Sequence, residues 1–431
     1  MSHASALLRE HFGIAGGELA VGGLAVSRLA EQFETPLFVY DAAVLRDRLA
    51  ALRLALPKRV EVYYSVKANP NPAVIGVFVA AGTGLEVASG AEFLRARSAG
   101  CPAERIVFAG PGKTARELEL VVSEGIGEIH LESEEELAAL AGLKAGANVS
   151  VRFNPGAEAS GGAMRMGGKP AQFGFDEERL GDVIAAISAH PQLRFSGVHM
   201  FAGTQILDAD VLVGQWRHAV EVARRAADLA GGPVATVDLG GGLGIPYFPH
   251  ESALDLGAVR TAAAELFAEV ETDPAFSGTR FILEPGRFLA GPAGVYVCRI
   301  LSKKESRGTT FLVLDGGMNH HLAASGNLGQ VIKRDYPILN ASRPDAGPPA
   351  ETVVVGPLCT PLDTLGRKVP LPPAKRGDLV AVLQSGAYGL TASPVGFLSH
   401  PMPAEVLVEE GTPRLIRERG SFRHPIVPLP G

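Results

Sequence analysis

Short apolar segments recur along the first two thirds of the chain, and stretches with the periodicity of an amphipathic helix lie between them. In these stretches, Ser133 with Glu136 fits a capping box at a helix start, and Asp208 precedes an amphipathic run that ends at Leu229. Eight alternations of strand and helix predict an α/β protein with a (β/α)8 barrel of the TIM type, and a doubly wound open sheet is the alternative. The predicted strands lie at 62–67, 84–89, 106–109, 129–132, 149–153, 195–200, 236–239 and 281–283.

The pattern changes after Arg287, where short segments rich in Val, Leu and Ile are separated by Gly and Pro turns instead of helices. They predict a C-terminal antiparallel β domain. The apolar run at 19–26 lies outside the barrel count, and we expect this N-terminal strand to join the β domain. The predicted domains are a cofactor-binding barrel at 34–287 and a β-sandwich or β-barrel formed by 1–33 and 288–431. The short segments lie at 294–301, 310–314, 352–355, 378–383, 405–408 and 413–416.

Composition is that of an ordinary globular protein, with 46% hydrophobic and 20% charged residues. The net charge of −6 is too small to argue for nucleic acid or an anionic membrane as a partner. The N-terminal residues do not resemble a secretory signal, and no apolar run approaches the roughly 18 residues of a membrane span, so we expect a cytoplasmic location. Cys101, Cys298 and Cys359 are an odd number without metal-type spacing, which argues against disulfides and against a zinc site.

Charged side chains gather at the predicted C-terminal ends of the barrel strands. Lys67 ends the first strand and is followed at once by a turn of Asn and Pro. Taken alone, such a lysine is more simply a surface amine whose stem lies on apolar surface. The C-terminal ends of barrel strands face the catalytic mouth, however, and several strands carry a polar group there. The residues concerned are Lys67, Glu86, Arg152, His199, Asp238, Glu284 and Arg287.

Two turns at strand ends suggest what these charges bind. The glycine run 240–242 leaves backbone amides free to approach a phosphate, although a tight turn without a ligand is the alternative. It is not the dinucleotide fingerprint, because Ile245 occupies the place of the last glycine. In Glu284-Pro285-Gly286-Arg287, the carboxylate would favour a protonated pyridine nitrogen and the guanidinium could bind phosphate or carboxylate, unless the two pair with each other. Together with Lys67, these turns predict a pocket for a phosphorylated aromatic cofactor held by an imine.

Six motifs in this order resemble those of the fold-type III pyridoxal-phosphate decarboxylases, the group of diaminopimelate and ornithine decarboxylases. The resemblance extends from about residue 33 to residue 408. The motifs are Tyr-Ser-Val-Lys-Ala-Asn at 64–69, Gly-Leu-Glu-Val-Ala-Ser at 84–89, the glycines 240–242, Glu-Pro-Gly-Arg at 284–287, Cys359 with Asp363, and Gly-Ala-Tyr-Gly at 386–389.

The resemblance implies a barrel followed by a β domain, a bound pyridoxal 5′-phosphate, and a homodimer in which two subunits build each site. It implies Lys67 as the Schiff-base lysine and Glu284 as the partner of the pyridine nitrogen. From the second subunit, Cys359 would act as proton donor and Tyr388 would reach the phosphate. The other cofactor-binding positions that it implies are Glu86, Arg152, His199, Phe201, Thr204, Gly240, Gly241, Gly242, Gly286 and Arg287, and the substrate-binding positions are Arg287, Thr360, Asp363 and Tyr388.

Two departures from the family pattern bear on the substrate. Phe201 stands where diaminopimelate and ornithine decarboxylases place a histidine over the cofactor ring, which keeps the stacking face and loses a polar contact. Thr360 stands next to Cys359, where those enzymes carry an acid that receives the distal ammonium of the substrate. Losing this charge-assisted hydrogen bond would cost a distal ammonium roughly 1.5 to 3 kcal/mol, so we expect a neutral distal end.

The details around 320–327, 356–363 and 393–398 are similar to a bacterial branch of the family that includes exosortase-associated decarboxylases and butirosin-type enzymes acting on carrier-bound glutamyl groups. A thioester at the side-chain carboxyl is neutral and leaves the α-amine free. The sequence therefore predicts a carboxy-lyase that decarboxylates an acidic aminoacyl group tethered to an acyl- or peptidyl-carrier protein. Alternatives are a decarboxylase of free diaminopimelate or another free amino acid, a non-catalytic cofactor carrier, and a racemase.

The remaining polar candidates carry weaker expectations. His320 and His321 could suggest a metal site, but they lack partners at ligand spacing, and no metal is predicted. Cys101 and Cys298 are expected to be small core residues rather than reactive thiols. Asp363 could orient the loop of Cys359 or only cap a turn. The glycine-rich loop 156–174 carries Arg165, Lys169 and Gln172, whose roles the sequence does not define.

Overall fold

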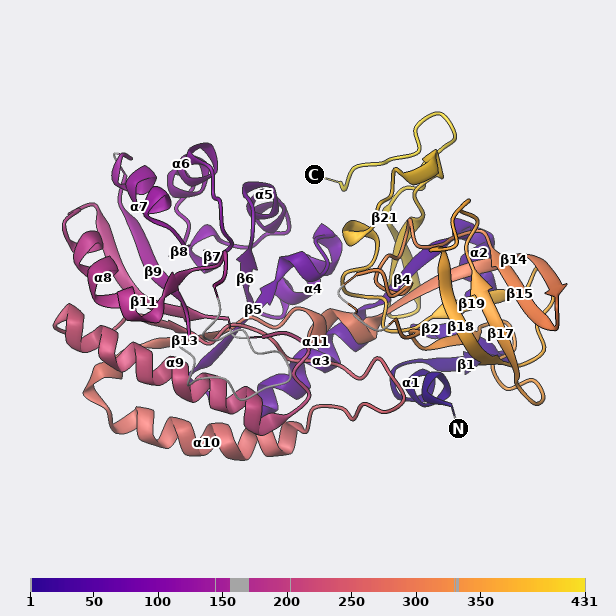
Figure 1. The fold of residues 1–431 in the computed structure, drawn as a ribbon, viewed down its shortest axis with the longest axis horizontal. Coiled ribbons are helices and arrows are strands. Elements are labelled where there is room, and N and C mark those ends of the chain that lie inside the picture. The colour runs from indigo at the N-terminus through magenta and orange to yellow at the C-terminus, as the bar shows by residue number, and fades with distance from the viewer. Residues whose placement is uncertain are drawn as a thin grey trace. The chain divides into compact units, whose positions relative to one another are not determined.

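The computed structural model describes residues 2–143, 145–155, 170–201, 203–328, 330 and 333–430. The chain divides into two compact units (Figure 1). The barrel unit contains Leu49–Ile245 and Ser252–Phe288, and the β unit contains Met1–Arg48, Pro246–Glu251 and Leu289–Gly431. Most of the predicted loop 156–174, including Arg165 and Lys169, lies outside the described residues.

Eight parallel strands close into a barrel, which confirms the predicted (β/α)8 architecture and excludes the open sheet. Strand β13 pairs with β5, and β8 pairs with β9, so the ring of hydrogen bonds is complete; the short β10 (Phe175–Asp176) adds to the end of β9. The barrel strands are β5 (Val60–Ser65), β6 (Gly84–Val87), β7 (Ile106–Phe108), β8 (Glu128–Leu131), β9 (Ala147–Asn154), β11 (Leu193–Met200), β12 (Thr236–Asp238) and β13 (Arg280–Leu283).

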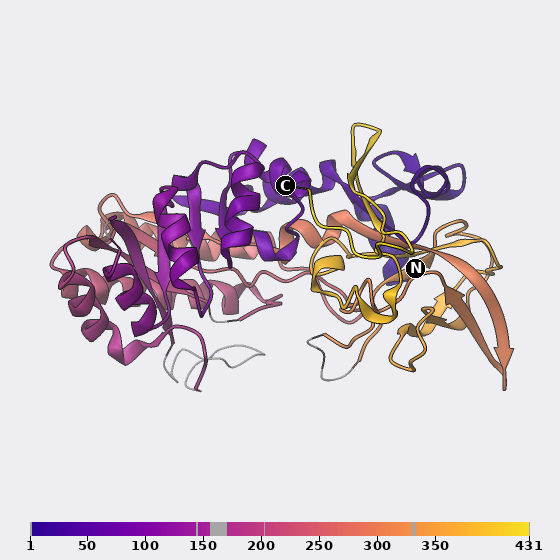
Figure 2. The ribbon, with the colours of Figure 1, turned by 90° about the horizontal axis from the view of Figure 1, so that it is seen from above.

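Helices lie outside the barrel strands in both views (Figures 1 and 2). They are α4 (Pro72–Ala80), α5 (Gly90–Ser98), α6 (Ala115–Ser123), α7 (Glu134–Ala141), α8 (Leu180–Ser188), α9 (Ala209–Ala230) and α10 (Leu256–Thr272), while α3 (Ala42–Ala55) and α11 (Arg287–Ala290) each span a boundary between the two units. Among the described helices, none combines the length and the apolar character that crossing a bilayer requires.

The predicted helix starts at Ser133 and Asp208 are confirmed, because each side chain caps its helix by accepting a backbone N–H. The capping box at Ser133 is only half formed, however. The Glu136 carboxylate accepts the Lys113 amine at 3.1 Å and the Glu132 N–H at 3.0 Å instead of turning back to the cap. A buried ammonium thus competes successfully for the carboxylate that would complete the box.

The β unit is built on one large mixed sheet, with core residues such as Val39, Val295 and Val406 on its inner face. Two pairs are parallel, β4 with β20 and β15 with β17, so the predicted purely antiparallel pattern needs correction. The strands of this sheet are β4 (Leu37–Asp41), β14 (Gly294–Ser306), β15 (Thr309–Leu314), β16 (Ile338–Asn340), β17 (Ala350–Val355), β18 (Thr364–Leu371), β19 (Leu379–Val382), β20 (Ala404–Glu409) and β21 (Thr412–Arg417).

The N-terminal run 19–26 belongs to the β unit, as expected, and its Leu19, Val21 and Val26 lie in that unit's core. It forms a small sheet of its own, however, and does not pair with the large sheet. Strands β1 (Gly13–Ala15), β2 (Glu18–Val21) and β3 (Leu24–Ala25) pair with one another between α1 (His3–His11) and α2 (Val26–Phe33). The glycines at 22 and 23 have φ of 56° and 82°, which folds the run back on itself as a hairpin. The N-terminal strand that enters the large sheet is β4, which the predicted domain limits had placed in the barrel.

Candidate active site

The barrel places its polar side chains at the carboxyl ends of the strands, as predicted. Strand pairing aligns Ser65 with Glu86 and aligns His199 with both Arg152 and Asp238. The glycines 240–242 follow β12, Glu284 and Gly286 follow β13, and Arg287 begins α11. Phe201 comes directly after β11, and Thr204 lies three residues further on in the connection to α9.

Lys67 lies in a single 3₁₀ turn, Val66–Ala68, immediately after β5. Its Nζ lies 3.1 Å from both carboxylate oxygens of Glu86, whose side chain is 1% exposed. The Lys67 side chain itself is 42% exposed and lies 5.9 Å from the centre of the Phe201 ring. A buried carboxylate therefore draws the amine to the mouth of the barrel and leaves it accessible, which a lysine serving only as surface charge does not require.

Arg152 forms a buried ion pair that the sequence did not indicate. Its guanidinium lies 2.6 Å from Glu132, and its Cζ lies 4.9 Å from the centre of the Phe173 ring. Burial works against the ionised form of Glu132, but the charges of Arg152 and Lys113 outweigh it and hold the pKa of this carboxyl below its usual value. Glu132 ends the predicted strand 129–132, and that position was the available signal.

Four buried side chains meet inside the barrel, with one potential ligand atom from each lying within 4.8 Å of the others; we call them the central cluster. They are His130 from β8, His199 from β11, Asp238 from β12 and Glu284. The imidazole centres of the two histidines are 4.3 Å apart. His199 Nε2 lies 3.4 Å from Glu284, and His130 Nε2 lies 3.7 Å from Asp238. Sequence reasoning identified three of the four and missed His130.

The protonation states within the central cluster differ between similar groups. Burial lowers the pKa of His199 to about 4, so its imidazole is neutral at pH 7. Burial and the neighbouring Glu284 charge raise the pKa of Asp238 well above its usual value. For Glu284, burial acts in the same direction, but the two histidines and Lys67 outweigh it and hold the pKa of this carboxyl below its usual value. The two carboxyl groups are therefore shifted in opposite directions, so a single negative charge within the pair is favoured on Glu284 over Asp238.

The side chains of the central cluster could in principle hold a zinc ion or the ring nitrogen of a cofactor. Two imidazoles and two carboxylates are acceptable zinc ligands, but ligand atoms around zinc lie about 3.3 Å apart, and this cluster spreads to 4.8 Å. In addition, Glu284 Oε1 is buried and has no hydrogen-bond partner among the described residues. A protonated ring nitrogen would supply the missing donor, so the cluster fits a pyridine-type cofactor.

The glycine run provides a second part of such a site. Gly240 and Gly242 have φ of 68° and 92°, which favours glycine, and a Cβ at Gly240 would collide with the carbonyl oxygen of Met200. A Cβ at Gly241 would likewise collide with the carbonyl oxygen of Glu284. The run therefore packs directly against the residue that holds the buried charge, and only glycine fits there.

The predicted residues of the β unit lie in two loops. Cys359 is exposed, and Tyr388 is half-buried with a φ of 53°. Asp363 is 2% exposed, and its carboxylate accepts the N–H groups of Met318 at 2.7 Å and Leu358 at 2.8 Å. Of the two roles considered for Asp363, this geometry favours orientation of the Cys359 loop.

His320, His321, Cys101 and Cys298 are buried, which confirms that the two cysteines are core residues. Burial raises the pKa of the Cys101 thiol to about 11, so this thiol is not reactive at neutral pH. His321 Nε2 lies 3.0 Å from Ser385 Oγ, and His320 Nδ1 lies 3.2 Å from the Tyr296 hydroxyl. The described surroundings thus satisfy both histidines with neutral partners.

Comparison with known families agrees with this chemistry. The profile of the family described as "Pyridoxal-dependent decarboxylase, pyridoxal binding domain" matches residues 42–291. The match covers more than half of the chain, so the protein belongs to this family. It is a pyridoxal-phosphate-dependent decarboxylase, that is, a carboxy-lyase, and its cofactor is pyridoxal phosphate.

Two curated relatives and one solved structure show which members of the family the chain is similar to. The chain is 40% identical over 403 residues to an L-glutamyl-[BtrI acyl-carrier protein] decarboxylase from Niallia circulans, covering 92% of this chain and 94% of the relative. It is 32% identical to a diaminopimelate decarboxylase from Aquifex aeolicus, with 96% of both chains covered. The crystal structure of the diaminopimelate decarboxylase from M. jannaschii matches with a TM-score of 0.88 at 27% identity, covering 98% of this chain and 99% of that one.

Proposed function

We propose that the protein decarboxylates an acidic aminoacyl group, of the glutamyl or aspartyl type, that is tethered by its side-chain carboxyl to a carrier protein. The products would be CO2 and the corresponding carrier-bound amine. The 40% identity to a decarboxylase of an acyl-carrier-bound glutamyl group supports this substrate class. The alternative, decarboxylation of free diaminopimelate, is supported by the 32% identity to the Aquifex aeolicus enzyme.

The observation that carries the proposal is the chemistry of the Cys359 loop. Within residues 356–363, Asp363 is the single acid, and its two carboxylate oxygens accept backbone N–H groups of Met318 and Leu358. Its carboxylate is therefore engaged, and Thr360 beside Cys359 offers only a hydroxyl. A distal ammonium would find no carboxylate in this loop to balance its charge, whereas a neutral thioester needs none.

For cofactor binding, we assign Lys67 as the amine that attaches the cofactor and Glu284 as the partner of its ring nitrogen. Bound pyridoxal phosphate supplies an electron sink for the electron pair left when the α-carboxylate departs as CO2. The raised pKa of Asp238 and the lowered pKa of Glu284 favour negative charge on Glu284, whose Oε1 has no described partner. The other residues that we assign to cofactor binding are Glu86, Arg152, His199, Phe201, Thr204, Gly240, Gly241, Gly242, Gly286, Arg287 and Tyr388.

We assign the return of a proton to Cys359 and the exchange of the substrate amine to Lys67. The Cys359 thiol is exposed and holds the proton for return to the substrate's α-carbon. Glu86 orients the Lys67 amine through the 3.1 Å contacts, so that the amine can exchange with the incoming α-amine. We assign Arg287, Tyr388 and Thr360 to substrate binding and Asp363 to positioning the Cys359 loop, and we infer a homodimer with composite sites and a cytoplasmic location.

The experiment is a CO2-release assay with two substrate sets. Glutamyl and aspartyl groups loaded on a carrier protein are expected to turn over, and free diaminopimelate, ornithine, lysine and glutamate to turn over at least about a hundredfold more slowly in kcat/KM. The variant Thr360→Glu restores an acid beside Cys359, and Thr360→Gln is the matched neutral control. We expect Thr360→Glu alone to improve kcat/KM for diaminopimelate. Rapid turnover of free diaminopimelate by the wild type would overturn the proposal in favour of the alternative.

A further inference from the structure

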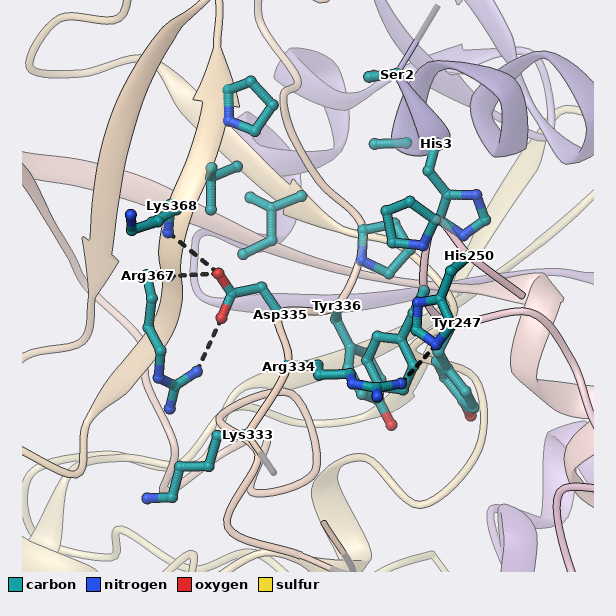
Figure 3. Close-up of a pocket in the computed structure, with 17 residues that line it drawn as sticks. Ser2, His3, Tyr247, His250, Lys333, Arg334, Asp335, Tyr336, Arg367 and Lys368 are labelled. Carbon is teal, nitrogen blue, oxygen red and sulfur yellow. Dashed lines mark hydrogen bonds and ion pairs between the residues drawn. The ribbon is translucent and has the colours of Figure 1, made fainter. Parts of the chain in front are cut away.

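A pocket of about 560 Å³ lies entirely within the β unit; we call it the basic pocket (Figure 3). Its wall combines the segment Tyr247–His250, which follows the glycine run in the chain, with residues before and in β16 and with strand β18. The volume is within the range of small-ligand sites. The lining residues are Ser2, His3, Ala4, Tyr247, Phe248, Pro249, His250, Lys333, Arg334, Asp335, Tyr336, Pro337, Ile338, Arg367, Lys368, Val369 and Pro370.

The charge of the basic pocket is opposite to that of the chain. The whole protein has 40 Lys and Arg against 46 Asp and Glu, whereas the lining has four cations and one acid. Asp335, that single acid, is already paired with Arg367 at 2.8 Å. Lys333, Arg334 and Lys368 have no further acid within the lining to pair with, and this excess of cations in the lining favours an anionic ligand.

The partners of the cationic side chains show which of them hold the fold of the pocket together. Arg367 also donates to the Ser325 carbonyl oxygen at 2.9 Å, so it holds the local fold together. Lys333 donates to the neutral side chain of Asn327, and the Lys368 amine lies 4.0 Å from Glu351 with its side chain 79% exposed. These two lysines carry charge at the pocket with little structural duty.

The opposite wall is aromatic and apolar. The rings of Tyr247 and Tyr336 are 4.5 Å apart, and both residues are largely buried. Arg334 Cζ lies 5.4 Å from the centre of the Phe248 ring, and its NH1 donates to His250 Nε2 at 2.6 Å. In Figure 3, Arg334 lies beside Tyr336, while Lys333 and Lys368 occupy other sides. The pocket thus joins fixed positive charge to an apolar surface.

We propose that the basic pocket docks the carrier protein that delivers the aminoacyl group, with the carrier's acidic side chains and the phosphate of its arm against Lys333, Arg334 and Lys368. This inference rests on the proposed function. A carrier protein presents its cargo on a flexible, phosphate-linked arm, whose negative charge is complementary to the cations of the basic pocket. Charge complementarity of this kind steers encounter and fixes register.

The test compares two double charge reversals that change the net charge equally. Lys333→Glu with Lys368→Glu alters the pocket, and Lys303→Glu with Lys304→Glu alters exposed positions on β14 in the same unit. The probes are a fluorescent carrier protein bearing its unloaded arm, for Kd, and the glutamyl-loaded carrier, for KM. We expect the pocket variant to raise Kd and KM about tenfold and the β14 variant to change either less than about twofold.

Several controls separate the possible failures. Circular dichroism and melting of the holoenzyme test folding, and the neutral pair Lys333→Gln with Lys368→Gln should give an effect of the same sign and about threefold size if the reversal does not fold. Wild-type turnover of the loaded carrier with unchanged KM in the pocket variants would overturn docking alone. No wild-type turnover of the loaded carrier would overturn the proposed function and the docking with it. A change in oligomeric state by light scattering would identify the pocket as an interface between copies and also overturn docking.

Discussion

The molecule contains two pairs of buried histidines whose surroundings differ. In the β unit, His320 and His321 bond to hydroxyl and amide groups, including Asn319 Nδ2 at 3.0 Å from His320 Nε2. In the barrel unit, the ring nitrogens of His130 and His199 have no partner with hydrogen-bond geometry among the described residues, although carboxylates lie nearby. The buried histidines therefore have hydrogen-bond partners in the β unit and lack described ones in the barrel unit.

This difference separates polar groups that are buried as part of the packed fold from those that are buried at a binding site. A buried polar atom without a partner costs about 1 to 3 kcal/mol, so it persists where a ligand completes it or where it serves the chemistry. The buried atoms of the central cluster that lack a described hydrogen-bond partner, Glu284 Oε1 among them, belong to the residues that we propose for the cofactor site. His320 and His321, which have hydrogen-bond partners, are expected to contribute to stability only.

Replacing Lys67 by Ala should lower kcat by about 10⁴-fold or more if, as we propose, this amine after β5 attaches the cofactor. Borohydride reduction of the holoenzyme followed by mass spectrometry should find the cofactor fixed in the wild type and not in the variant. The exposed Lys303→Ala change is the control. Stoichiometric fixation in the Lys67 variant would contradict the assignment.

Two buried carboxylates provide the second test. Glu284 has an oxygen without a described hydrogen-bond partner, whereas both oxygens of Glu405 have partners. Glu284→Gln should lower kcat by about a hundredfold to a thousandfold, because it removes the charge that we assign to the cofactor's ring nitrogen, with a smaller change in melting temperature. Glu405 pairs with Arg417 at 2.5 Å and accepts from Tyr40. Glu405→Gln should instead destabilise the protein by about 3 kcal/mol and leave kcat of the folded enzyme nearly unchanged. Denaturant titration and kinetics together measure both effects.

His130 and His321 give a matched histidine test. His130→Gln should lower kcat by about tenfold, because His130 helps hold the charge on Glu284, and it should shift the visible absorbance of the bound cofactor. His321→Gln should change neither property and should lower the free energy of unfolding by about 1 to 2 kcal/mol. Equal effects of the two changes on kcat would remove the distinction between the pairs.

Acid stability provides the smallest effect. The pKa of His321 is lowered to about 3 by burial, so between pH 6.5 and 3 the unfolded chain binds a proton that the folded chain does not. The free energy of unfolding therefore falls as the pH falls, by up to about 1.4 kcal/mol per pH unit for this residue. Urea titrations at several pH values from 6.5 to 5 give the free energy of unfolding at each pH. This free energy should fall less steeply with falling pH in His321→Gln than in the wild type. An unchanged slope would mean that His321 is not buried as a neutral base.

Much of the fold and site could be read from the sequence because the signals are local. An apolar strand followed by a polar residue or a glycine turn identified Lys67, Glu86, His199 and Glu284 without knowledge of their neighbours. Strand count and alternation were sufficient for the barrel. Cys359 and Tyr388 came from family resemblance, and the proton-donor role of Cys359 and the binding role of Tyr388 stay predictions.

What the sequence did not provide depends on contacts across the barrel or the sheet. His130 reads as an ordinary residue of a buried strand, and only the closed ring brings its imidazole 4.3 Å from that of His199. Glu132 meets Arg152 because β8 pairs directly with β9, and the register of that pairing is not visible in the sequence. The run 19–26 and strand β4 have similar apolar character, and the glycine hairpin at 22–23, rather than hydrophobicity, decided which one enters the large sheet.

The position of β4 also has a consequence for biosynthesis. In the β unit's sheet, β4 lies between β14 and β20, and Leu37 is aligned with Ala404 from near the other end of the chain. The strands of the barrel are made before β20 leaves the ribosome, so the barrel is expected to fold during translation while β4 waits for its last neighbour. Nascent chains arrested before residue 404 should therefore yield a protease-resistant barrel with an unprotected N-terminal segment.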